Sequence, residues 1–156
     1  KESLKYNIVI SDFSKADSDK KVNTALEKVG FRKKINYNTV LSKEFGGIEL
    51  SGGEWQKIAA ARVAFKDADI FVLDEPTAAI DPLEEVRLYK LFDEMSAGKT
   101  SIFVTHRLGS VLFSDLVLYL EDGHIVEMGT HDELLEIDGK YAKYWRIQAS
   151  QYLEDN

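Results

Sequence analysis

The sequence predicts an α/β fold in which a parallel sheet is packed with helices and is preceded by an α-helical segment. Residues 70–73 (Ile-Phe-Val-Leu) form an apolar run, and residues 101–105 (Ser-Ile-Phe-Val-Thr) contain another at 102–104; both segments have the length of buried strands. A helix pattern lies between them, beginning with Pro82 after an Asp81 cap and ending at Gly98. A helix that connects two strands is typical of parallel pairing. Because two such strands usually belong to a larger sheet, we expect further strands upstream of the first residue.

Two helices are predicted before the first strand. Residues 17–30 place apolar side chains at helical spacing and end in Gly30, a common C-terminal stop. Ser51, followed three residues later by Glu54, forms a capping box, and the helix that it opens should reach about residue 65. The two glycines in the first turn of that helix lower its intrinsic stability.

A hairpin and a helical tail are predicted after the second strand. The dipeptide Asp-Gly at 122–123 is a strong hairpin signal between strands at 116–120 and 125–128. The Thr-x-x-Glu pattern at 130–133 is a second capping box, and it opens a helical tail that should reach about residue 152.

Composition excludes several classes of protein. The 156 residues include no cysteine, which rules out disulfides, thiolate metal sites and cysteine nucleophiles. No apolar run approaches the roughly 18 residues that a membrane-spanning helix needs, so we expect a soluble segment. The net charge of -7 argues against nonspecific binding to nucleic acid. We interpret the basic run at 32–34 as a solvated face.

The helix start at residues 50–54 (Leu-Ser-Gly-Gly-Glu) is a candidate phosphate site. It combines a serine hydroxyl with the amides of Gly52 and Gly53, and both the N–H groups and the helix dipole favour an anion there. The plainer alternative is a helix start with flexible glycines.

Polar residues follow both predicted strands. Asp74 and Glu75 follow the first strand, and His106 follows the second, so the carboxyl ends of the strands would place them at one edge of the sheet. Asp74 offers a hard oxygen suited to Mg²⁺ through water, and Glu75 could activate a water molecule. The alternatives are a pair of solvated loop acids and a structural histidine.

Taken together, four ordered strings resemble motifs of the ATP-binding-cassette (ABC) ATPases. Residues 50–54 resemble the signature motif, 70–76 the Walker B motif, 78–81 the D-loop and 104–107 the H-loop. Residues 123–127 and the helical tail at 133–149 resemble the C-terminal end of exporter-type cassettes. Over the whole chain, the resemblance is closest to bacterial peptide or lantibiotic exporters.

The resemblance implies a partial P-loop NTPase-type sheet from which the N-terminal P-loop part is absent. Residues 1–66 would form a helical subdomain that ends in the signature helix, and 67–156 would form the C-terminal part of the ATPase core. The parent protein would be an ATPase that uses ATP and Mg²⁺ and couples hydrolysis to transmembrane export. Its partners would be transmembrane domains and a second nucleotide-binding domain, at the cytoplasmic face of the membrane.

The resemblance also implies a role for each site residue. Asp74 would bind the water shell of Mg²⁺, and Glu75 would polarise the attacking water. His106 would contact the γ-phosphate, and Asp81 would communicate across a dimer. The signature motif Leu50, Ser51, Gly52, Gly53 and Glu54 would face the γ-phosphate held by the second subunit of a head-to-tail dimer.

Three features depart from the family pattern. Glu54 stands where the family more often has glutamine, which adds a negative charge near a phosphate site. No G-x-x-x-x-G-K-[ST] string occurs, and the one Gly-Lys-Thr, at 98–100, follows a helix instead of a strand. No glutamine precedes Gln56, so the Q-loop is missing too. We therefore expect the chain to begin inside the helical subdomain and to be inactive alone.

The sequence leaves two alternative functions open. One is a non-catalytic module that lends its signature helix to the P-loop of another protein. The other is a chromosome-maintenance ATPase, although the 50 residues before Ser51 lack the heptad pattern of a coiled coil and the acidic balance disfavours DNA.

Overall fold

The computed structural model describes residues 2–76 and 82–154. The chain divides into two units, Lys1–Val104 and Thr105–Asn156, and each is described by itself. This division differs from the predicted subdomain boundary after residue 66, which concerns function and stays a prediction.

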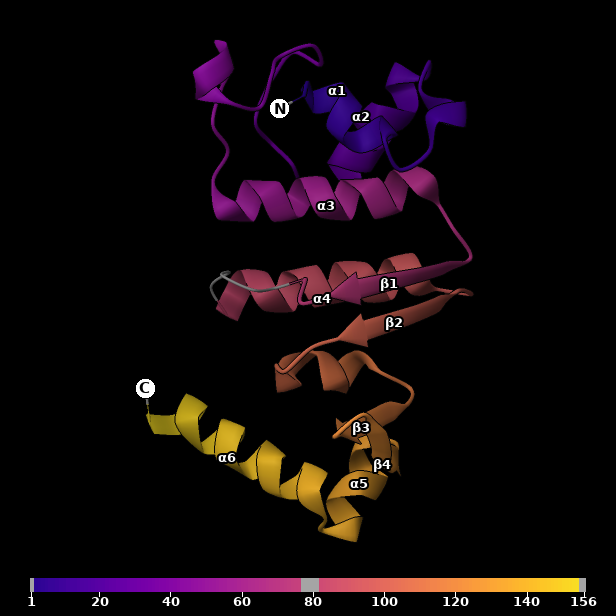
Figure 1. The fold of residues 1–156 in the computed structure, drawn as a ribbon, viewed down its shortest axis with the longest axis vertical. Helices are drawn as coiled ribbons and strands as arrows, with labels where there is room; N and C mark the ends of the chain where they lie inside the picture. The colour runs from indigo at the N-terminus through magenta and orange to yellow at the C-terminus, as the bar shows by residue number, and fades with distance from the viewer. Residues whose placement is uncertain (1, 77–81, 155–156) are drawn as a thin grey trace. The chain divides into compact units, whose positions relative to one another are not determined.

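The first unit begins with helices that pack on one another. They are α1 (Leu4–Val9), a 3-10 turn (Phe13–Lys15), α2 (Asp19–Lys28), a second 3-10 turn (Lys43–Phe45) and α3 (Gly52–Lys66). Figure 1 shows α3 running alongside both α1 and α2. Ile8, Val22 and Ile58, one from each helix, are fully buried and form the centre of this core. The predicted helices at 17–30 and 51–65 are thus confirmed.

Helix α1 has no clear signal in the sequence, and contacts from distant residues hold it in place. Its N-cap Ser3 accepts a hydrogen bond from the backbone N–H of Tyr6. Arg62 of α3 donates from Nε to the Asn7 carbonyl oxygen at 2.6 Å and from its guanidinium to Asn7 Oδ1 at 3.1 Å. A six-residue helix is too short to be stable by itself, so these contacts from α3 stabilise it.

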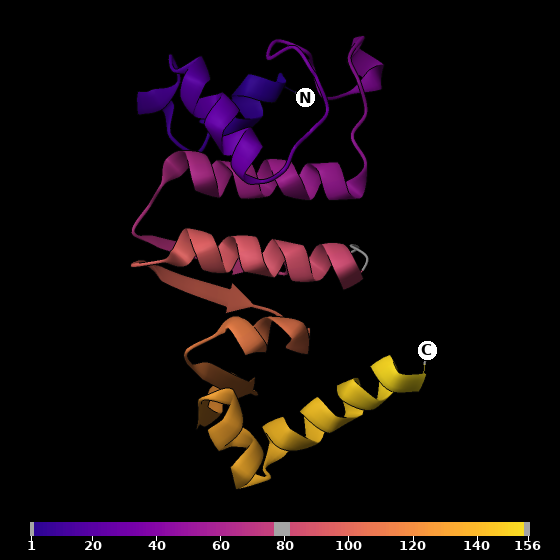
Figure 2. The same cartoon turned by 180° about the vertical axis from the view of Figure 1, so that it is seen from behind.

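Strands β1 (Ile70–Asp74) and β2 (Thr100–Val104) pair in parallel, as predicted, with Val72 opposite Ile102. Helix α4 (Pro82–Ser96) connects them and covers one face of the pair. The view from behind shows α4 in front of β1 (Figure 2). The ring of Phe103 lies 6.0 Å from Tyr89 and 6.1 Å from Phe92, so the aromatic side chains of α4 anchor the helix on the sheet.

The two strands, predicted to be buried, are buried on one face only within the described residues. Phe71 and Leu73 point into the core, but Ile70 is 63% exposed and Val72 is 59% exposed. Ile102 and Val104 are exposed in the same alternating way. The reason is that, among the described residues, elements pack on only one face of this two-stranded sheet.

The second unit contains a 3-10 segment (Leu108–Phe113), β3 (Val117–Glu121), β4 (His124–Gly129), α5 (His131–Ile137) and α6 (Lys140–Glu154). The predicted hairpin is confirmed: Asp122 and Gly123 both have positive φ, 49° and 76°, as a type I′ turn requires. The predicted capping box is confirmed as well, because Thr130 Oγ1 accepts the N–H of Glu133 and the Glu133 carboxylate accepts the N–H of Thr130.

The predicted helical tail consists of two helices, α5 and α6. Asp138, with φ 54°, ends α5 in the left-handed conformation. Glu127 of β4 then caps the start of α6, since its carboxylate accepts the N–H of Lys140 at 2.6 Å and that of Tyr141 at 3.1 Å. Tyr141 is buried beside Leu134 of α5, so the break packs the two helices together.

None of the helices in the described parts of the chain is long and apolar enough to cross a membrane.

Candidate functional site

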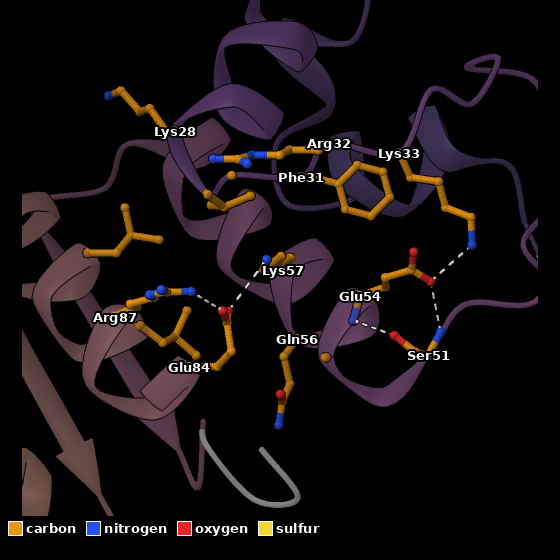
Figure 3. A pocket seen from close by; sticks show the side chains of 15 residues that line it. Lys28, Phe31, Arg32, Lys33, Ser51, Glu54, Gln56, Lys57, Glu84 and Arg87 are labelled. Carbon is orange, nitrogen blue, oxygen red and sulfur yellow. Dashed lines mark hydrogen bonds and ion pairs between the residues drawn. The ribbon is translucent and has the colours of Figure 1, made fainter. Parts of the chain in front are cut away.

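The N-terminus of α3 is built by the capping box that the sequence predicts. Ser51 has extended backbone angles (φ -67°, ψ 164°), and its Oγ accepts the N–H of Glu54 at 3.2 Å. In return, Glu54 Oε2 accepts the N–H of Ser51 at 2.9 Å (Figure 3). Leu50, just before the cap, is buried and fixes the direction in which the chain enters the helix.

Gly52 and Gly53, the first two residues of α3, have no side chains to cover the backbone of its first turn. Neither has a positive φ, and beyond the adjoining residues and the backbone of the same helical turn, a Cβ built on either glycine would meet no atom of the described residues within 4 Å. Packing within the described residues therefore does not require glycine at these positions, although a glycine in a helix costs about 1 kcal/mol relative to alanine. Glycine is common where a ligand or another molecule approaches the backbone closely, and the two glycines here are consistent with such a site. Their amides and the Ser51 hydroxyl are the donors that could meet it.

A pocket of about 800 Å³ lies beside this helix end. Its charged lining residues are mostly basic: Lys28, Arg32, Lys33, Lys57 and Arg87, with the two carboxylates Glu54 and Glu84. Both carboxylates are in ion pairs within the pocket (Figure 3). The lining therefore has an excess of positive charge, in a chain whose net charge is -7.

Two of the three ion pairs in the pocket, Lys33–Glu54 and Lys57–Glu84, join segments that are distant in the sequence, and the third, Arg87–Glu84, lies within α4. Lys33 Nζ lies 3.1 Å from Glu54 Oε2. Arg87 reaches Glu84 at 2.5 Å, and Lys57 reaches the same carboxylate at 3.6 Å. The pKa of Glu54 is lowered, first by the hydrogen bond from the Ser51 backbone and also by Lys33, so this carboxylate is ionised at neutral pH.

The carboxyl end of β1 presents the two acids that the sequence singles out. Asp74 is the last residue of β1 and is exposed. Glu75 follows in the left-handed region, with φ 46°, and its N–H donates to the Val104 carbonyl at 2.8 Å. A non-glycine residue held in this conformation is strained, and such strain concentrates at functional sites. The bond to β2 holds Glu75 at the edge of the sheet, partly buried.

The donor set at this edge fits a magnesium ion that keeps most of its water. Asp74 offers an exposed hard-oxygen ligand, and Mg²⁺ in proteins is commonly held by one or two carboxylates and several waters. No group of three or more potential metal ligands occurs within residues 2–76 and 82–154.

His106 belongs to the second unit, where α6 holds its backbone. Gln148 Nε2 donates to the His106 carbonyl oxygen at 2.8 Å. The Thr105 hydroxyl accepts the N–H of Arg107 at 3.0 Å, which turns the chain sharply at this point. Asp81, the predicted D-loop residue, lies outside the described residues.

The structure therefore places most of the predicted site residues in the first unit. Residues 50–54 form one helix start, and Asp74 and Glu75 form one strand end. The sequence did not reveal the basic lining of the pocket. Arg32, Lys33 and Lys34 are exposed, as predicted for a solvated run, but Lys33 is also paired with Glu54. A pair separated by 21 residues leaves no periodic signal in the sequence.

Comparison with known proteins identifies the family. A family model described as ABC transporter matches residues 1–78, which is half of the chain. The chain belongs to the ABC transporter family. The matched region contains the α3 capping box, Asp74 and Glu75.

Individual relatives place the chain among exporter-type nucleotide-binding domains of the ABC transporter family. An uncharacterized ABC transporter ATP-binding protein of Haemophilus influenzae is 46% identical over 110 residues, covering 70% of this chain and 18% of the relative. The nisin transport ATP-binding protein of Lactococcus lactis is 36% identical over 160 residues, covering 99% of this chain and 26% of the relative.

A solved structure agrees with this placement. The structure of a bacterial Atm1-family ABC exporter with ATP bound matches with a TM-score of 0.80 and 31% identity, over 95% of this chain and 26% of that one. The expected α/β fold with a parallel sheet is thereby confirmed. The chain spans about a quarter or less of the length of these proteins.

Proposed function

We propose that this chain forms one half of an ATP-hydrolysing site in a transport protein: the signature helix that faces a partner's nucleotide, and the carboxylates that activate water. The observation that supports this most strongly is the bare first turn of α3, where two glycines stand without any packing requirement in the described residues. A backbone kept clear in this way suits close contact with a phosphate.

The N-terminus of the signature helix would act as an anion-binding site. The N–H groups of Gly52 and Gly53 and the hydroxyl of Ser51 would donate to the γ-phosphate of ATP held by a second nucleotide-binding domain, in a head-to-tail dimer. The positive end of a 15-residue helix and the basic pocket beside it favour the same charge. Leu50 and Glu54 would position this turn, through burial and through the capping box.

The end of β1 would carry the hydrolytic chemistry. Glu75 would accept a proton from the attacking water, and its strained backbone, bonded to Val104, would keep the carboxylate at the sheet edge. Asp74 would hold Mg²⁺ through water, and this ion, when bound, neutralises phosphate charge. His106 would contact the γ-phosphate, and Asp81 would communicate between the two halves of the dimer.

Residues 1–66 would be the helical subdomain and 67–156 the C-terminal part of the ATPase core. The 156 residues contain no G-x-x-x-x-G-K-[ST] string, so a P-loop outside them would supply the main ligands of the β- and γ-phosphates. The isolated chain should therefore be inactive. The whole protein would act at the cytoplasmic face of a membrane, joined to transmembrane domains, and the alignment with a nisin transport protein over 99% of the chain favours peptide export.

The test is ATP hydrolysis by the whole transporter with Glu75→Gln, compared with Glu94→Gln on the exposed side of α4. Loss of a general base typically lowers turnover by about 100-fold or more, so Glu75→Gln should nearly abolish hydrolysis while ATP still binds. The control should retain full turnover. Equal turnover in the two variants would exclude Glu75 as the catalytic base.

A further inference from the structure

We propose that Lys33 is a positioning residue for the signature helix: it holds the Glu54 carboxylate in the capping box and cancels its charge at the end of α3 that faces phosphate. This inference rests on the proposed function, because the charge matters only if an anion binds at that helix end. It concerns Glu54, the one acidic residue of the signature motif at residues 50–54.

The geometry joins Lys33 and the capping box through a single oxygen. Glu54 Oε2 accepts the N–H of Ser51 at 2.9 Å and lies 3.1 Å from Lys33 Nζ. Lys33 lies in the segment after α2, beyond Gly30, whose φ of 63° turns the chain away from the end of that helix. The Lys33 side chain is 41% exposed and that of Glu54 is 27% exposed, so the pair lies at the pocket rim, where water screens it only in part.

The charge of Glu54 opposes the proposed ligand. A carboxylate in the first turn of a helix stabilises the helix, but it also repels an anion that approaches the neighbouring Gly52 and Gly53 amides. A neutral glutamine would cap without this repulsion. In this chain, the positive charge of Lys33 removes the repulsion while Glu54 keeps its capping bonds.

The other carboxylate in the pocket lining is also neutralised by cations. The other carboxylate, Glu84, is paired with Arg87 and Lys57. Lys28 and Arg32 make no ion pair with any residue in the described ranges. Each acidic charge in the lining is thus matched by a cation, and a positive excess remains for the anion.

The first test measures the coupling without any nucleotide. NMR titration of the Glu54 carboxyl should show its pKa rise toward the ordinary glutamate range in Lys33→Met, because a stabilising cation is lost. Lys34→Met is the matched control, since Lys34 is exposed in the same segment and does not line this pocket. An unchanged Glu54 pKa in Lys33→Met, or the same rise in both variants, would overturn the proposal.

The second test asks whether the pair matters for nucleotide. In the whole transporter, Lys33→Met should raise the apparent KM for MgATP by about 3- to 10-fold, as expected for one uncompensated charge near a phosphate. Lys33→Arg should restore the wild-type KM. In a Glu54→Gln background, Lys33→Met should change KM by less than about 2-fold, since no carboxylate remains to be neutralised.

The outcomes separate this inference from the proposed function. If Glu75→Gln abolishes hydrolysis but Lys33→Met leaves the KM unchanged, only the role of Lys33 is wrong. If Lys33→Met raises KM equally with Glu54 and with Gln at position 54, Lys33 acts on nucleotide by another route and the proposal fails. If Glu75→Gln has no effect, the proposed function itself fails.

Discussion

The cap that Glu127 provides for α6 makes a quantitative prediction about stability. The carboxylate accepts the N–H groups of Lys140 and Tyr141, which would otherwise be unsatisfied donors at the helix start. Loss of a helix N-cap costs about 0.5 to 2 kcal/mol, and loss of an acidic charge at the positive end of the dipole about 0.3 to 1 kcal/mol more. Glu127→Ala should therefore lower the free energy of unfolding by about 1 to 3 kcal/mol.

Gly139 tests the same contact from the other side. A Cβ on Gly139 would lie 2.3 Å from Glu127 Oε1, and the three nearest atoms all belong to the Glu127 carboxylate. Gly139→Ala should therefore displace the cap and cost about 1 to 2 kcal/mol. In a Glu127→Ala background the same change should cost close to nothing, because the obstructing carboxylate is gone.

The assay is urea unfolding followed by tryptophan fluorescence and circular dichroism. Trp145 lies in the unit concerned, with its ring centroid 4.3 Å from that of His131. Glu136→Ala, at an exposed position of α5, is the control and should change stability by less than about 0.5 kcal/mol. If Glu127→Ala is as stable as this control, the capping contact does not stabilise α6. The same conclusion follows if the loss of stability in the Glu127→Ala/Gly139→Ala double variant equals the sum of the losses in the two single variants.

Two further predictions concern the first unit and the dependence of stability on pH. Gly47→Ala should destabilise by about 3 kcal/mol in urea unfolding, because a Cβ there would lie 1.8 Å from the Val40 carbonyl oxygen; a loss below about 0.5 kcal/mol would contradict this close approach. Both capping-box glutamates, Glu54 and Glu133, have lowered pKa values, chiefly because each accepts a backbone N–H. A folded pKa below the unfolded one gives stability that is fully present above roughly pH 5 and is lost as the pH falls through the folded pKa. Between roughly pH 6 and pH 3, the free energy of unfolding should therefore fall less steeply with pH in a Glu54→Gln/Glu133→Gln variant than in the wild type. An unchanged slope would contradict the lowered pKa values of these two glutamates.

The parts of the fold that could be predicted from sequence are those set by local chemistry. The capping boxes depend on side chains three residues apart, and the hairpin depends on an Asp-Gly pair that tolerates positive φ. The parallel pairing of β1 and β2 followed from two apolar runs separated by a helix.

The features that could not be predicted depend on contacts between distant residues. Helix α1 is held by Arg62, 55 residues away from Asn7, and the start of α6 is held by Glu127 of β4. Lys33 meets Glu54 only because α2 and α3 pack together. Exposure of one face of β1 was also beyond prediction, since an apolar run does not reveal which of its faces is covered.

The central claim is that this chain contributes the signature helix and the carboxylates of an ATP site whose phosphate cradle lies on another segment. Calorimetric titration of MgATP into the 156-residue chain, and in parallel into the whole transporter, tests it directly. We expect saturable binding by the transporter and none by the isolated chain at millimolar nucleotide. Saturable binding of one MgATP to the isolated chain, with the same affinity as the transporter, would contradict the claim, because these residues would then hold a complete phosphate site.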